Sequence, residues 1–168
     1  MESRLYTFVN PLYMKEIQHG IQSLHVLGEL HQKYHRICIC AESDLLYDWN
    51  DNHKTVIVLA GGPHGELVAI RDYMFTDARM LGLPFAHFNE DEYSLGGILT
   101  CVGVVVPEPL YNAVNGRVAW ASDYGISDHA SISTSLFYRN AEGELTVYEE
   151  DSPEWRFITL LKSKPLAK

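Results

Sequence analysis

Two uninterrupted apolar runs place the strongest constraint on what this chain can fold into. Lys54–Ala60 reads KTVIVLA, and Thr100–Pro107 reads TCVGVVVP. A continuous β-branched run such as KTVIVLA is typical of a strand that is buried on both faces. Such a strand needs other elements above and below it, so the sequence predicts an α/β fold in which helices pack on a sheet.

The segments around these two runs predict one mixed sheet. Apolar residues with helical spacing predict helices at 15–34 and 64–81, and Gly82 is the expected end of the second helix. Arg4–Val9 and the run PFAHF, 84–88, are further strand candidates. The first 110 residues therefore predict the order β-α-β-α-β-β. The intervening segment RICICAE fits either a strand or the frayed end of the first helix.

The character of the sequence changes after Pro109. The runs SISTSLFYR, ELTVYEE and WRFITLL alternate in the manner of strands, and NAEG between the first two is expected to form a hairpin turn. We therefore expect a single domain with two parts. Residues 1–111 form its core, and residues 112–168 form a β-rich extension that packs on the same core.

Composition and charge argue against several classes of protein. The chain has 168 residues, 46% of them hydrophobic, which is enough for one packed core. We expect no membrane segment, because no apolar run approaches ~18 residues. The beginning of the chain has no basic segment before an apolar stretch, so we expect no signal peptide. The formal net charge is −9 and basic residues never cluster, so extended nucleic acid is not an expected partner.

The cysteines and histidines give no sign of a metal site or a disulfide framework. Cys38 and Cys40 form a CxC pair without a second pair, and Cys101 makes the total odd. The eight histidines form neither HxH nor HExxH. We therefore expect reduced thiols, a cytoplasmic location, and no metal or cofactor.

The helix predicted at 15–34 carries polar residues in a regular pattern. Gln18, Gln22 and His25 are spaced i, i+4 and i+7, so they share one stripe of the helix. The pattern fits an ordinary amphipathic helix as well as a helix that carries a binding site. For His25 we expect a structural role, as a core histidine bonded to a backbone carbonyl. The neighbouring apolar stripe consists of Ile17, Ile21, Leu24, Leu27 and Leu30.

Five features, in this order along the chain, resemble peptidyl-tRNA hydrolase of the second type. They are the β-α-β-α-β-β order, the Gln22-x-x-His25 pair, Trp49 before the KTVIVL strand, LGLP at Leu81–Pro84, and the closing TCVGVVVP strand. The resemblance covers residues 4–109 and leaves 112–168 outside. It implies a cleft between the first helix and the loop before the last strand, and it suggests a bacteriophage origin.

The departures from the family pattern bear on the expected activity. The family's first helix has a lysine that is held to be essential for hydrolysis, and Gln18 occupies that position here. The family's second motif, D-A-G-x-T-Q, falls on HFNEDEYSLGG, where Phe88 or Asn89 replaces the aspartate and Glu92 and Tyr93 lie near the Thr-Gln pair. Glutamine supplies neither a charge nor a proton at neutral pH. We therefore expect negligible cleavage of peptidyl-tRNA in a cleft that otherwise survives.

We expect this remodelled cleft to bind a small nucleotide-type ligand, and either to sequester or to hydrolyse it. Hydrolysis without a metal needs a general base and a general acid near the ribose 2′-OH, and the candidates are Lys15, His19 and His129. For a phage protein, interception of a cyclic-nucleotide defence signal would be a reasonable role by analogy. The expected ligand-binding residues are Gln18, Gln22, Asn89, Glu92, Tyr93 and Tyr124.

Two other classes of function stay open. The first is a peptidyl-tRNA hydrolase whose catalytic residues have moved to other positions. The second is a non-catalytic interaction module that uses the β-rich extension as its partner surface. We also expect the chain to form a homo-oligomer.

Overall fold

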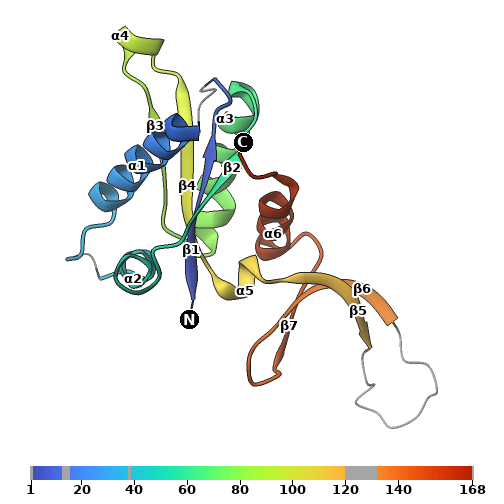
Figure 1. The fold of residues 1–168 in the computed structure, drawn as a ribbon. Coiled ribbons are helices and arrows are strands. Elements are labelled where there is room, and N and C mark those ends of the chain that lie inside the picture. Colours follow the sequence, from blue (N-terminus) through green and yellow to red (C-terminus); the bar gives the residue numbers. More distant parts are fainter. Residues whose placement is uncertain (1, 13–15, 38, 120–131, 168) are drawn as a thin grey trace, which may run out of the picture.

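The computed structural model describes residues 2–12, 16–37, 39–119 and 132–167, and a mixed sheet of four strands lies at its centre (Figure 1). The strand order is β2-β1-β4-β3. β1 pairs parallel with β2, whereas β4 runs antiparallel to both β1 and β3. The predicted α/β fold with a mixed sheet is confirmed. The strands are β1 Ser3–Val9, β2 Val56–Ala60, β3 Phe85–Asn89 and β4 Leu99–Pro107.

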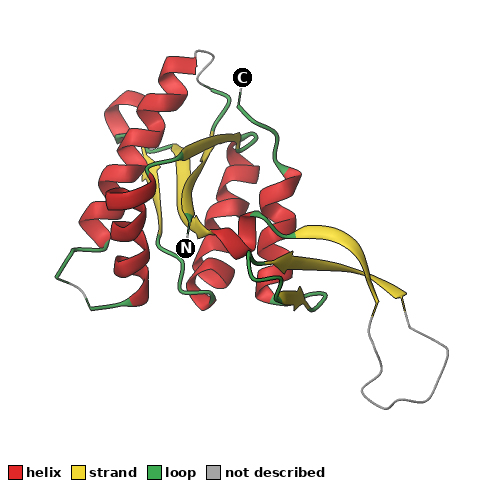
Figure 2. Ribbon diagram, turned by 60° about the horizontal axis from the view of Figure 1, so that its bottom comes forward, coloured by secondary structure: helices red, strands yellow, loops and turns green. Residues whose placement is uncertain are grey.

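Helices cover both faces of the sheet, which explains why its two central strands are buried along nearly their whole length (Figure 2). Alternate residues of a strand point to opposite faces. Cys101 of β4 packs in one core cluster with Val26, and its neighbour Val102 packs in the other with Leu67. Within the described residues, no helix is long and apolar enough to cross a membrane. One face carries α1 Glu16–Lys33 and α2 Ala41–Asp48, and the other carries α3 His64–Tyr73 and α6 Pro153–Ser163.

The segment between α1 and β2 forms a helix that neither interpretation of RICICAE predicts. The described residues of RICICAE make a turn that leads into α2. α2 continues into a π-helical turn, η1, Trp49–His53, which ends at Lys54 with a left-handed φ of 59°. The strand expected from Lys54 therefore begins only at Val56. The Trp49 indole is buried, and its Nε1 donates to the carbonyl of Thr55 at 3.0 Å.

The second predicted helix is present, with a π-helical turn near its end. α3 continues directly into η2, Met74–Ala78. Gly82 follows with a φ of 64°, a conformation that glycine adopts without steric cost. The helix therefore ends where the sequence predicts.

The residues after β4 form a short helix and then a second, smaller sheet that projects from the body of the molecule (Figure 1). The turn NAEG joins β6 to β7, as predicted. In it, the backbone N–H of Glu144 donates to Oδ1 of Asn140 at 2.8 Å, and Gly143 has a φ of 85°. The elements are α5 Glu108–Tyr111, β5 Val114–Ala119, β6 Ile132–Arg139 and β7 Leu145–Tyr148.

The prediction of a strand at WRFITLL is wrong, because this run lies in α6. Ser152 caps the helix, since its Oγ accepts a hydrogen bond from the N–H of Trp155 at 3.1 Å, and a proline follows in the first turn. The buried residues of α6 are Phe157, Ile158 and Leu161. Their spacing of one and three is helical, and all three join the core cluster on the α3 face of the main sheet.

The last described residues return to the main sheet. The N–H of Ala60 donates to the carbonyl of Pro165 at 2.9 Å, and the N–H of Ala167 donates to the carbonyl of Val58 at 3.0 Å. These bonds place residues 165–167 antiparallel on the outer edge of β2, opposite β1.

Candidate functional site

The first half of α1 buries polar side chains and exposes apolar ones, whereas its second half buries apolar residues. Its buried residues are His19, Gln22, Ser23, Val26 and Leu30. The apolar residues Ile17, Ile21 and Leu24 are 72%, 45% and 67% exposed. An ordinary amphipathic helix would bury its isoleucines and leave the amides in water. Buried polar groups need hydrogen-bond partners, and the partners of α1 define the candidate site.

The first set of partners joins α1 to β1. The hydroxyls of Thr7 and Ser23 lie 2.8 Å apart, and Ser23 Oγ donates to the carbonyl of His19 at 2.9 Å. Thr7 shares a face of β1 with Leu5 and Val9, which pack among the residues of α1. A hydroxyl at this position of an otherwise apolar strand therefore satisfies a hydroxyl on the helix.

The second set of partners holds the amide of Gln22 at both ends. Thr100 Oγ1 lies 2.7 Å from Gln22 Oε1, to which it donates. Gln22 Nε2 donates to Oε1 of Glu90 at 2.9 Å. The amide thus connects α1 with β4 and with the residue that follows β3. The pairing register of β3 with β4 shifts between Phe88 and Asn89, at the point where the chain leaves β3 and turns toward this contact.

A second amide, that of Asn10, fixes the backbone just after β1, where the chain turns toward α1. Asn10 is buried, its Nδ2 donates to the carbonyl of Leu99 at 3.3 Å, and its Oδ1 accepts from the N–H of Leu12 at 3.0 Å. β1 and β3 run in the same direction, because each is antiparallel to β4. Their carboxyl ends therefore share one edge of the sheet, where α1 begins and the short helix α4, Glu92–Leu95, lies (Figure 1).

The predicted ligand-binding residues that the structure describes differ in how deeply they are buried. Gln22 is in the network, and Gln18 is half-buried one turn before it. Asn89 is exposed, and its Nδ2 donates to the carbonyl of Gly97 at 2.8 Å. Glu92 and Tyr93 lie on α4, and the Tyr93 side chain stands fully in solvent.

The predicted catalytic residues are described only in part. His19 is 7% exposed and lies in the buried face of α1. Lys15, Tyr124 and His129 lie outside the described residues. The expectation of a buried His25 is wrong, because this side chain is exposed and its ring stacks on Phe88 with centroids 4.4 Å apart and an interplanar angle of 11°.

Sequence reasoning missed the hydroxyl partners of the helix. Thr100 is the polar residue that opens the run TCVGVVVP, and Thr7 interrupts an apolar strand, which are the two signals that could have found them. Glu90 lies in the loop to which the family resemblance points. Among the described residues, no group of three or more His, Cys, Asp or Glu side chains is placed to hold a metal ion.

Comparison with known proteins adds no relative. Neither the search against protein-family models nor the search of curated proteins finds a match for this chain. The resemblance to peptidyl-tRNA hydrolase of the second type therefore stays a prediction, and the chemistry of the site is argued from its own side chains.

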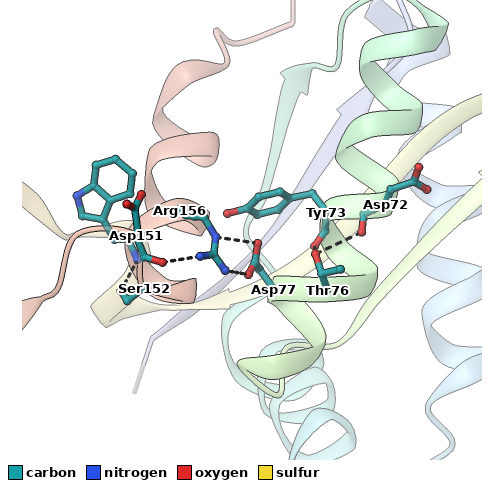
Figure 3. Close-up of polar contacts among 8 residues, drawn as sticks. Asp72, Tyr73, Thr76, Asp77, Asp151, Ser152 and Arg156 are labelled. Atoms are coloured by element: carbon teal, nitrogen blue, oxygen red, sulfur yellow. Dashed lines mark hydrogen bonds and ion pairs between the residues drawn. The ribbon is translucent and has the colours of Figure 1, made fainter.

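A separate polar cluster lies on the other face of the sheet and has a structural explanation (Figure 3). Asp77 of η2 is buried and forms a two-point ion pair with Arg156 of α6. Arg156 also donates to the carbonyl of Asp151, just before α6 begins. Burial, followed by the neighbouring Asp77 carboxylate, raises the pKa of the Tyr73 phenol above its usual value. The cluster fastens α6 to the helix formed by α3 and η2.

Proposed function

We propose that the protein binds a small nucleotide-type ligand at the edge of the sheet where α1 begins and α4 lies. The inverted burial of α1 carries the proposal. Burying Gln22 and Ser23 while isoleucines face water stabilises the fold less than the reverse arrangement would, so the burial of apolar surface does not account for it. A fixed array of amide and hydroxyl groups beside a loop is, in contrast, what recognition of a polar ligand requires.

The chemistry of the neighbouring loop suits a base and a ribose. The exposed ring of Tyr93 offers a face on which a base can stack, a contact worth about 1–3 kcal/mol. The amides of Gln18 and Asn89 and the carboxylate of Glu92 can pair with base edges and hydroxyls. Phosphate needs a cation, for which we propose Lys15. The net charge of −9 favours a ligand with few phosphates, such as a cyclic nucleotide.

We propose sequestration as the primary activity. Gln22 is bonded at both ends, and His19 is only 7% exposed, so these groups fit a fixed binding wall better than mobile acid–base catalysts. If the ligand is cleaved, the proposed acid–base residues are His19, His129 and Lys15.

A thermal-shift panel of mononucleotides and cyclic nucleotides, followed by calorimetric titration of the best compound, tests the proposal. Tyr93→Ala and Lys15→Ala should each weaken binding by about 1–3 kcal/mol. Phe75→Ala, which removes an exposed aromatic ring on η2, is the matched control and should leave binding unchanged. Chromatography of the incubated ligand separates sequestration from cleavage. Failure of every nucleotide to bind the wild-type protein would contradict the proposal.

Cleavage of peptidyl-tRNA, the activity that the family resemblance implies, is tested with the same protein preparation. We propose negligible turnover of peptidyl-tRNA, because Gln18 stands where the family has its lysine, and such charge stabilisation is worth several kcal/mol in an active site. Turnover at the rate of authentic peptidyl-tRNA hydrolases would instead favour relocated catalytic residues.

One observation favours a second candidate function, a non-catalytic interaction module, and it indicates α1 rather than the β-rich extension as the partner surface. The exposed Ile17, Ile21 and Leu24 form an apolar surface on α1 that a lone soluble chain has no reason to present. In this alternative, nucleotides do not bind and substitutions on α1 abolish association with a protein partner.

A further inference from the structure

An uncharged groove runs between the exposed face of α1 and strand β2. Its volume is about 470 Å³, and the described residues that line it carry no charge. Ile17, Ile21 and Leu24 form the helix wall, and Val56 and Val58 form the strand wall. α1 packs mainly over β3, β4 and β1, so it covers β2 less than it covers the other three strands.

Two glycines on the same helix indicate that another body approaches closely. Gly20 and Gly28 lie inside α1, where glycine destabilises a helix relative to alanine. A Cβ added at either position would meet no described atom within 4 Å. Packing inside this chain therefore gives no reason for glycine at these positions, whereas a surface in close contact with the helix would.

We propose that this face is the interface of a homodimer, in which α1 packs antiparallel on α1 of a second copy. A two-fold axis beside Gly20 and Ile21 pairs Ile17 of one chain with Leu24 of the partner subunit, and the reverse. The glycine then lets the two helix backbones approach, while the isoleucine and leucine side chains fill the space on each side. The pattern is self-complementary, which a two-fold interface requires.

The size of the face fits a second copy. Ile17, Ile21, Leu24 and Val56 expose on the order of 400 Å² of apolar surface, about the apolar share of the ~800 Å² that each partner contributes to a standard interface. An added peptide strand fits less well, because residues 165–167 already occupy the outer edge of β2 at Val58 and Ala60. A small apolar ligand in the groove would leave Ile17 in water.

Sedimentation velocity of the full chain over a concentration series tests the proposal. The wild-type protein should be a dimer, and Leu24→Glu should weaken the dimer at least tenfold by placing charges in the apolar interface. Gly20→Leu should also weaken it at least tenfold while the Tm of the monomer is unchanged or higher, because leucine favours a helix and the position is open. A change that stabilises the helix and breaks the dimer has no explanation within one chain.

Two variants serve as matched controls. Met80→Glu puts a charge at a side chain that is 71% exposed but lies after η2, and Gly65→Leu fills an equally open glycine in α3. Neither should affect dimerisation. Because each chain carries a net charge of −9, raising the salt concentration from about 50 mM to about 500 mM should strengthen an uncharged interface.

Three results would overturn the proposal. They are a wild-type monomer up to millimolar concentration, a dimer that survives both α1 substitutions, and a dimer that either control breaks. The proposal does not depend on the nucleotide site, because Tyr93 and Lys15 are left intact in every variant used here.

Discussion

Gln22 is the residue on which the candidate site depends, because one amide joins three parts of the fold. Its oxygen accepts a hydrogen bond from Thr100 and its nitrogen donates one to Glu90, so both polar groups of the buried amide have a partner. Both partners are distant in the sequence: Thr100 lies 78 residues after Gln22, and Glu90 lies 68 residues after it. The position of the loop after β3 relative to α1 therefore rests on this side chain.

Replacing Gln22 by glutamate tests this dependence. The Gln22→Glu variant places a second carboxylate where the amide donates to Glu90, and we expect a loss of about 1–3 kcal/mol in the free energy of unfolding at pH 7. The loss should shrink toward pH about 5, because the folded pair then takes up a proton that relieves the repulsion. Denaturant unfolding at both pH values measures it. Gln32→Glu, exposed on the same helix, should change stability by less than about 0.5 kcal/mol.

Tyr148 predicts how stability depends on alkaline pH. Its hydroxyl donates to the carbonyl of Pro109 at 2.9 Å, and burial raises the pKa of Tyr148 to about 12 from its usual value of 10.0. The unfolded chain loses this proton first, so stability should fall as the pH rises above about 10 and should level off above about 12. Tyr148→Phe should flatten this part of the curve in denaturant unfolding. A curve that is as steep in the variant would assign the alkaline loss to other groups.

Residue patterns in the sequence located part of the site, for a physical reason. Helical periodicity gives the angle between side chains, so it grouped Gln18 and Gln22 correctly. It does not say which stripe faces the sheet, so the prediction of a core position for His25 was wrong, and the exposure of Ile21 could not be foreseen. Single hydroxyl residues such as Thr100 carry no pattern of their own, so their role emerges only when the strands are in register.

At the scale of elements, α6 shows how the extension is attached to the body. Three of its apolar residues enter the core cluster on the α3 face, and the Asp77–Arg156 pair fastens the helix to η2 (Figure 3). Removing Arg156 leaves the buried Asp77 carboxylate without its partner, which destabilises the fold, whereas Arg156 itself is 39% exposed.

A double-mutant cycle at this pair measures how tightly α6 is held. Asp77→Ala and Arg156→Ala should each destabilise the protein, and the double variant should lose less than their sum, with a coupling of about 1–3 kcal/mol. Denaturant unfolding of the four proteins gives the coupling. Additive losses would mean that the two side chains do not act together. Arg71→Ala, which breaks the exposed pair with Asp72, should change stability by less than about 1 kcal/mol.

Elements were predictable where their pattern was long. The helices at 15–34 and 64–81 span several turns, and the runs at 54–60 and 100–107 are continuous, so each has one good interpretation. WRFITLL is too short to separate alternation from helical spacing, and the deciding signal is the Ser-Pro start just before it. α2 was missed because the apolar residues of RICICAE, just before it, fit a strand or the end of the first helix.

At the scale of the whole molecule, the extension and the sheet share one core. Leu136 of β6 and Phe157 of α6 belong to the same cluster as Phe8 of β1. We therefore expect one cooperative unfolding transition, with the loss of circular dichroism and the change in tryptophan fluorescence at the same denaturant concentration. Two separate transitions would show that 112–168 unfolds as an independent unit.

The central pairing of β1 with β4 also sets the order of events during synthesis. Ser3 lies opposite Pro107, so the inner edge of the first strand stays without its antiparallel neighbour until more than a hundred residues have left the ribosome. Contacts this distant in sequence close slowly, and an unpaired apolar strand is prone to associate with other chains in the meantime. The nascent protein should therefore depend on chaperones until β4 emerges, and its yield should fall when translation outpaces their supply.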